Sequence, residues 1–170
     1  MKKRHHIMHN ILLYSVFIFY MLLLLAILFR TSHTYRSVNL VPFRSIISYL
    51  SGKDTVFRSF AFTNVIGNIV IFLPFGVYLA LFNPDKRLFK NVLFVFLFSL
   101  SVEILQYTLK LGIGDIDDVI LNCLGGALGI AAYKILLSIF KDADKVRHLI
   151  EILAPTVGIL SFLFLFLYNL

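Results

Sequence analysis

The sequence has few acidic residues, a single cysteine and no tryptophan. Nine aspartates and glutamates stand against 16 lysines and arginines in 170 residues. Because Cys123 is the only cysteine, an internal disulfide is excluded. It lies in an apolar segment beside glycines, which favours a packing role over a redox or ligand role. In so basic a chain, any cluster of carboxylates needs an explanation.

Hydrophobic residues make up 59% of the chain, too many for a soluble globular protein. A helix needs about 20 mostly apolar residues to cross a bilayer core of roughly 30 Å. The sequence therefore predicts one all-α domain over residues 1–170, a polytopic membrane helix bundle. Five spans are predicted, at residues 10–29, 61–82, 88–109, 117–140 and 150–168.

The N-terminus resembles a signal peptide, with basic residues before an apolar run. The run continues to Phe29, which is too long for a signal peptide, and residues 30–33 offer no small-x-small cleavage pattern. We therefore interpret it as a retained first span. The charged residues 141–148 are expected to form a turn between the last two spans.

The basic residues predict the orientation of the chain. If the spans alternate, ten fall on the side of the N-terminus and six on the other. By the positive-inside rule the N-terminus is cytoplasmic and the C-terminus extracytoplasmic. The positive charge thus indicates topology and contact with membrane lipids, and it gives no reason to propose nucleic acid as a partner.

The segment 42–50 is too apolar for a free loop. Pro42 can open a helix, and Phe43, Ile46, Ile47 and Leu50 then recur at helical spacing. This predicts an amphipathic helix on the outer membrane surface. It could be a plain anchor or a functional lid.

The most distinctive stretch is 112–126, which places three aspartates at the mouth of an apolar segment. On a helix starting near Asp115, the residues Asp115, Asp118 and Asn122 share one face. Helix capping explains one aspartate, at about 0.3–1 kcal/mol, but not three in four residues. Gly125 and Gly129 continue near this face, where they would let the second or third span approach closely or would drive self-association into a homo-oligomer.

Other polar residues fall at the same predicted membrane level. The second span begins with Asn64 and Asn68, and Glu103 is an ionisable residue at depth in the third, where such groups usually face a bundle interior. The inner halves of these spans are almost purely apolar. The pattern predicts one polar pocket open to the extracytoplasmic side. Its candidate ligand-binding residues are Asn39, Arg44, Asn64, Asn68, Gln106, Asp117 and Asn122, and its candidate catalytic residues are Glu103, Asp115 and Asp118.

The order of these motifs resembles the VanZ-like family, bacterial membrane proteins associated with resistance to the glycopeptide antibiotic teicoplanin. The resemblance covers about residues 39–137. It rests on Asn39-Leu-Val-Pro-Phe43, Asn64-x-x-Gly-Asn68 with Phe72-Leu-Pro-Phe-Gly76, Glu103-x-x-Gln106, and Asp115-Ile-Asp-Asp118-x-x-x-Asn122-x-x-Gly125-x-x-x-Gly129. Many members of the family carry an arginine just before the aspartates, whereas this chain has Gly-Ile-Gly at residues 112–114. If that arginine pairs with the carboxylates, either Arg44 or Lys110 takes its place in this chain, or the site here differs from that of the family.

The resemblance implies a role in the bacterial cell membrane but brings no established reaction. Teicoplanin binds the D-alanyl-D-alanine end of the lipid-linked wall precursor, so an outward pocket lies on the correct side. The first hypothesis, which we favour, is a binder of a lipid-linked peptidoglycan precursor, a lipid or the antibiotic. The second is an intramembrane hydrolase or transferase, in which Glu103, Asp115 and Asp118 bind a divalent cation or act as an acid–base pair.

The sequence argues against two other possibilities, a bound metal ion and a transporter. The cluster lacks a histidine and does not have EF-hand spacing, which argues against a bound metal. A transporter should continue its polar groups toward the cytoplasm, and here they stop halfway.

Overall fold

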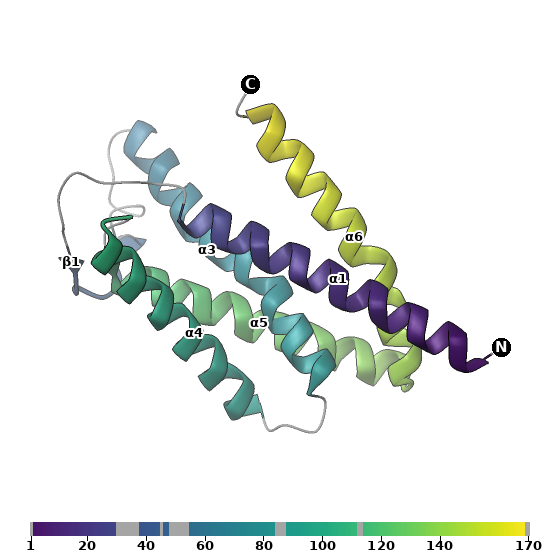
Figure 1. Ribbon diagram of the computed structural model, residues 1–170. Coiled ribbons are helices and arrows are strands. Elements are labelled where there is room, and N and C mark those ends of the chain that lie inside the picture. The colour runs from purple at the N-terminus through teal and green to yellow at the C-terminus, as the bar shows by residue number, and fades with distance from the viewer. Residues whose placement is uncertain are drawn as a thin grey trace. The chain divides into compact units, whose positions relative to one another are not determined.

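The computed structural model describes residues 2–29, 38–44, 46–47, 55–83, 88–111 and 114–168, with the side chains of all of these except 2–9, 55–63 and 157–168. Figure 1 shows the helices and strands. The helices within the described ranges are α1 (Lys2–Leu28), α3 (Thr55–Phe82), α4 (Leu88–Leu109), α5 (Ile116–Phe140) and α6 (Ala143–Tyr168). Two short strands, β1 (Val38–Asn39) and β2 (Gly114–Asp115), complete the described elements. The predicted all-α class is confirmed.

Four of the described helices are long and apolar enough to cross a membrane. The qualifying segments are Asn10–Leu28, Asn64–Phe82, Leu88–Leu109 and Ile116–Phe140. They match the first four predicted spans to within a few residues, so this is a membrane protein by helix length and composition. The fifth predicted span, 150–168, lies in α6. Because the side chains of 157–168 lie outside the described residues, that span stays a prediction.

The predicted interfacial helix at 42–50 is only partly covered. Arg44, Ile46 and Ile47 are helical, and the Ile47 N–H donates to the Phe43 carbonyl at 2.8 Å. Ser45 and residues 48–50 lie outside the described residues. The prediction of one continuous amphipathic helix therefore stays open.

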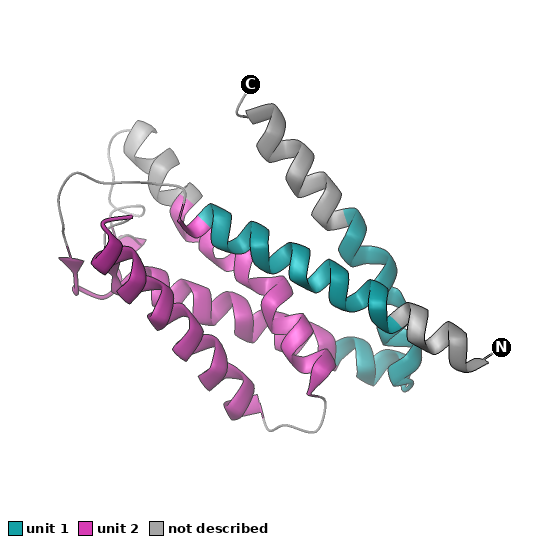
Figure 2. Ribbon diagram, in the orientation of Figure 1, with its two compact units in different colours: residues 1–27, 135–170 teal, residues 28–134 magenta. Residues whose placement is uncertain are grey.

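The chain divides into two compact units, coloured in Figure 2. Unit 1 comprises residues 1–27 and 135–170, and unit 2 comprises residues 28–134. The prediction of a single domain stays a prediction. The segments that carry the predicted site all belong to unit 2.

Within unit 2, α5 packs against α3 through glycines. A Cβ atom added to Gly125 would lie 2.2 Å from the Ile69 carbonyl oxygen, and one on Gly129 would lie 2.0 Å from that of Leu73. A Cβ on Gly76 would lie 2.0 Å from the carbonyl oxygen of Gly126. The two helices thus touch at their backbones. The predicted close approach is confirmed, with the second span as the partner, while self-association stays a prediction.

The end of α4 directs the chain into the site. Lys110 adopts a left-handed backbone conformation with φ 59°, and the Leu111 N–H donates to the Gln106 carbonyl at 2.9 Å. This is a Schellman-type helix end, which satisfies carbonyl groups of the last turn. Further on, β2 pairs in parallel with β1, with Val38 opposite Gly114 and Asn39 opposite Asp115. The pairing holds the segment before α3 against the start of α5.

In unit 1, α6 begins earlier than predicted. Asp142 caps it, because its Oδ1 accepts hydrogen bonds from the N–H groups of Asp144 at 2.9 Å and Lys145 at 3.3 Å. The prediction that residues 141–148 form a turn is therefore wrong from Ala143 onward. The charged residues after this cap lie on a helix, where residues three and four apart are neighbours.

Candidate functional site: a carboxylate–amide cluster

Asp115 is the N-cap of α5 and does not lie within the helix. Its Oδ1 accepts hydrogen bonds from the Asp117 N–H at 2.9 Å and from the Asn39 side-chain amide at 3.0 Å. The predicted helical face shared by Asp115, Asp118 and Asn122 is therefore wrong for Asp115. The physical reason is that Asp115 pairs with Asn39 as part of β2, and α5 starts only at Ile116.

Glu103 of α4 reaches the same junction. Its side chain is buried, with 7% of the residue exposed, and its Oε2 accepts a hydrogen bond from the Asp115 N–H at 3.0 Å. Asp115 and Asp118 also interact with Glu103 electrostatically, both as like charges. The acidic residue predicted to face the bundle interior does so, and it meets the start of α5.

Asp118, in the first turn of α5, is held by α3. Its Oδ1 accepts hydrogen bonds from the side-chain amides of Asn64 at 3.1 Å and Asn68 at 2.7 Å. The two asparagines thus share one face of α3, as their spacing predicts. They act together on a single carboxylate oxygen.

Asp117 is almost completely buried, with 1% of the residue exposed, and ties the segment after β1 to α5. Its Oδ1 accepts a hydrogen bond from the Phe43 N–H. Phe43 has φ 64°, in the left-handed region that residues other than glycine rarely adopt. Strained backbone of this kind persists where surrounding contacts enforce it, often near functional sites.

Asn122 lies one turn deeper in α5, with 1% of the residue exposed. Its Nδ2 donates to the Ser99 hydroxyl oxygen at 2.9 Å, and its Oδ1 has no hydrogen-bond partner in the described part of the chain. Ser99 was not among the predicted site residues. Its position four residues before Glu103, on the same face of α4, is the signal that could have indicated it.

Gln106 is turned toward the end of α1. Its Nε2 donates to the Leu28 carbonyl at 2.6 Å, while its Oε1 is buried and has no partner among the described residues. Among the described residues, the Gln106 side chain therefore forms no hydrogen bond with the other polar residues of the predicted site.

We call the residues that are joined by hydrogen bonds around the start of α5 the carboxylate–amide cluster. It consists of Asn39, Asn64, Asn68, Ser99, Glu103, Asp115, Asp117, Asp118 and Asn122.

The two cations expected to pair with the cluster do not do so. Arg44 and Lys110 are both exposed, and within the described residues neither forms an ion pair with a carboxylate. The expectation that one of them substitutes for the arginine of other family members is therefore wrong for this arrangement. Arg44 stays a predicted ligand-binding residue only.

The cluster does not fit a metal ion as it is arranged. Among the described residues, no three side chains of histidine, cysteine, aspartate or glutamate converge as a metal site requires. Glu103, Asp115 and Asp118 each turn one oxygen toward amide N–H groups. Hard cations need several oxygens converging at about 2.0–2.6 Å, so this arrangement does not support the divalent cation that the enzyme hypothesis offers as one option.

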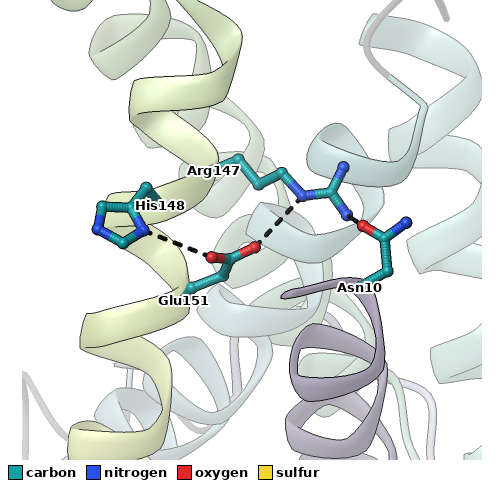
Figure 3. A network of polar contacts seen from close by, with 4 residues as sticks. All are labelled: Asn10, Arg147, His148 and Glu151. Atoms are coloured by element: carbon teal, nitrogen blue, oxygen red, sulfur yellow. Dashed lines mark hydrogen bonds and ion pairs between the residues drawn. The ribbon is translucent and has the colours of Figure 1, made fainter. Parts of the chain in front are cut away.

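A second polar network, in unit 1, was missed by the sequence analysis (Figure 3). Glu151 of α6, with 6% of the residue exposed, pairs with Arg147 at 3.4 Å and with His148 at 3.6 Å. Arg147 also donates to the side-chain oxygen of Asn10 in α1. The i, i+3 and i+4 spacing of these α6 residues would have indicated the network had they been assigned to a helix. It joins α1 to α6.

These features define a multi-pass helical membrane protein with a partly buried carboxylate–amide cluster where α3, α4 and the start of α5 meet. Comparison with protein families identifies the family to which the chain belongs. The VanZ/LLP1 family model matches residues 12–137, so the chain belongs to the VanZ/LLP1 family. The resemblance predicted from the sequence motifs is confirmed.

A curated relative agrees with this family. The chain is 36% identical over 98 residues to Protein VanZ of Enterococcus faecium. The alignment covers 58% of this chain and 53% of that protein, so it spans about half of the relative's length. No solved structure matches the chain.

Proposed function

We propose that this protein binds a cell-envelope ligand at the carboxylate–amide cluster and thereby lowers the susceptibility of the cell to glycopeptide antibiotics such as teicoplanin. The ligand is a lipid-linked wall precursor, a lipid or the antibiotic itself. Family membership supports the envelope role, and the cluster supplies the binding groups.

One observation carries the proposal: an ionisable carboxyl group is retained at depth without a compensating cation among the described residues. Glu103 lies within a span and is buried, and a carboxylate there costs on the order of 3 kcal/mol on insertion scales. A purely structural contact to the Asp115 N–H could be made by a neutral glutamine at lower cost. Retention of an ionisable carboxyl group, in place of a neutral amide, therefore supports a ligand-binding role.

The proposed orientation places the cluster on the extracytoplasmic side, where wall precursors are exposed. It follows from the ten basic residues on the side of the N-terminus against six on the other. Below the cluster, Gly125 and Gly129 bring α5 into backbone contact with α3. That contact leaves no room for a polar path between these two helices, which favours binding over transport.

An enzyme is the second candidate, because Glu103 and Asp115 meet in the same cluster and could act as an acid–base pair. Purified protein would then release phosphate or free carbohydrate from a lipid-linked wall precursor. Saturable binding of the same precursor without turnover supports the binder.

Antibiotic susceptibility tests the proposal. Cells expressing the wild type are compared with cells expressing Glu103→Gln or Asp118→Asn, at equal membrane abundance. We expect the wild type to protect against teicoplanin and both variants to lose that protection, because each replaces an ionisable carboxyl group by a neutral amide of nearly the same size.

Asp144→Asn is the matched control, since it also removes one carboxylate but at an exposed position of α6. It should protect as the wild type does. Full protection by Glu103→Gln and Asp118→Asn would show that the carboxylates are structural, and the proposal would fail.

A further inference from the structure

The carboxylates of the cluster receive hydrogen bonds only from neutral donors. Glu103 accepts from a backbone N–H, Asp115 from a backbone N–H and Asn39, and Asp118 from two asparagines. No lysine, arginine or histidine of the described ranges forms an ion pair with any of the three. Neutral donors only partly compensate a negative charge away from water, so full ionisation of these carboxyl groups needs a positive charge from outside the described residues.

Each of these three carboxylates also keeps one oxygen available. The hydrogen bonds to Asp115 and Asp118 all end on Oδ1, and the bond to Glu103 ends on Oε2. Within the described structure, the second oxygen of each group accepts no hydrogen bond. The three carboxyl groups therefore each keep an oxygen that can accept a hydrogen bond from a ligand.

Asn122 gives an independent indication of a ligand. Its Oδ1 is an acceptor without a partner although only 1% of the residue is exposed, and such a buried group is costly unless something donates to it. Side chains of an α-helix tilt toward its N-terminus, so the Asn122 amide lies over the turn that carries Asp118. The side chain with the unpaired acceptor is thus next to the turn that carries Asp118.

Two helix faces meet at this place. On α4, Ser99 lies four residues before Glu103, and on α5, Asp118 lies four residues before Asn122. Asn122 bonds Ser99, and the N–H of Asp115, at the start of α5, bonds Glu103. The two contacts link α4 to α5 and to the residue that caps it, at two levels.

We infer that the cluster binds a protonated primary amine of its ligand, with Glu103, Asp115 and Asp118 as counter-charges and Asn122 as an additional acceptor. A primary ammonium carries three N–H donors and no acceptor, which complements the unused carboxyl oxygens and the unpaired Asn122 oxygen. Charge-assisted hydrogen bonds of this type are the strong ones. The inference rests on the proposed function and specifies the chemistry of its ligand.

Two sources can supply such an amine, a lipid headgroup or an amino group on the peptide of a wall precursor. Binding is measured on purified full-length protein in detergent micelles, by thermal stabilisation and by native mass spectrometry. The first arm uses phosphatidylethanolamine and its N-acetylated form. The second arm uses a lysine-containing stem pentapeptide and the same peptide acetylated on its amino groups.

We expect one arm to show saturable binding of the free amine, weakened about tenfold to a hundredfold by acetylation. The arm that responds identifies the source. Glu103→Gln and Asp118→Asn should each weaken binding of the free amine by a similar factor, and Asp144→Asn should leave it unchanged. Equal binding of the free and acetylated probes, or no saturable binding of either amine, would overturn the inference.

The experiments distinguish a failure of the amine inference from a failure of the proposed function. If Glu103→Gln abolishes protection in cells while free and acetylated probes bind equally, the cluster is functional but does not recognise an amine. If Glu103→Gln protects fully in cells, the proposed function itself fails.

Discussion

Two buried glutamates in this protein have opposite surroundings. Glu151 of α6 and Glu103 of α4 are similarly buried, at 6% and 7% exposed. Glu151 pairs with Arg147 and His148 on its own helix, whereas Glu103 has a backbone N–H as its donor and two aspartates as electrostatic neighbours. A charge compensated from within is a structural feature. A carboxyl group without a cation among like charges either stays protonated or is compensated by a ligand, and our proposal is the second for Glu103.

The comparison teaches that burial of a carboxylate alone does not indicate function. Buried ion pairs often contribute little net stability, but removing one partner leaves an unpaired charge at high cost. Glu151 fits that description. Glu103 resembles the strained and locally unfavourable groups that proteins keep where activity needs them.

The largest expected effect comes from separating the helices that build the cluster. Gly125→Ala would place a methyl group 2.2 Å from the Ile69 carbonyl oxygen, so α3 and α5 must move apart. Overpacking of this kind costs about 1–3 kcal/mol or more. We expect membrane abundance and protection to fall together, measured by immunoblot and susceptibility.

Gly67→Ala is the matched control for this substitution. Apart from its own stretch of helix, no described part of the chain comes within 4 Å of a Cβ built there, and alanine favours a helix over glycine by about 1 kcal/mol. Its abundance should equal or exceed that of the wild type. Equal abundance of Gly125→Ala and Gly67→Ala would contradict the backbone contact between α3 and α5.

The second effect concerns Glu151. Glu151→Gln leaves Arg147 without its carboxylate, and because 30% of the Arg147 side chain is exposed, we expect a loss of about 2 kcal/mol, below the 3–5 kcal/mol typical of fully buried pairs. The thermal midpoint of the purified protein should fall by several degrees. An unchanged midpoint would show that the network of Figure 3 contributes nothing to stability.

The third effect is the change in thermal stability when Glu103 of the cluster is replaced by glutamine. Glu103→Gln keeps an acceptor for the Asp115 N–H and removes the repulsion from Asp115 and Asp118. We expect a thermal midpoint equal to or above that of the wild type. A midpoint as low as that of Glu151→Gln would mean that Glu103 is a structural ion whose compensating partner lies elsewhere in the chain.

The smallest effect is expected at Asn122. In Asn122→Leu the Ser99 hydroxyl can turn to a carbonyl of its own helix, so abundance should change little. Binding of the free-amine probe should weaken about fivefold through the loss of one acceptor. Tighter binding by the leucine variant would show that the Asn122 oxygen does not face the ligand.

Much of this arrangement could be predicted from the sequence, because long apolar runs and helical spacing are local signals. Four spans, the Asn64 and Asn68 pair and the glycine contact follow from such signals. Asp115 was placed wrongly because its conformation depends on pairing with Asn39, which is 76 residues away. Local periodicity carries no information about that partner.

The second network was missed for a related reason. Arg147 and His148 were assigned to a turn, and the spacing of their side chains to Glu151 becomes meaningful only once Asp142 is known to cap α6. The orientation of the helices in the membrane and the identity of the ligand stay predictions, since both depend on components outside the chain.

The most direct test of the account compares Glu103→Gln and Glu151→Gln in one assay. Teicoplanin protection is measured per unit of protein in the membrane, so that a loss of stability is corrected by abundance. The account predicts that Glu103→Gln loses protection per molecule and Glu151→Gln retains it. Retained protection in Glu103→Gln, or equal loss in both variants, would contradict the assignment of function to the carboxylate–amide cluster.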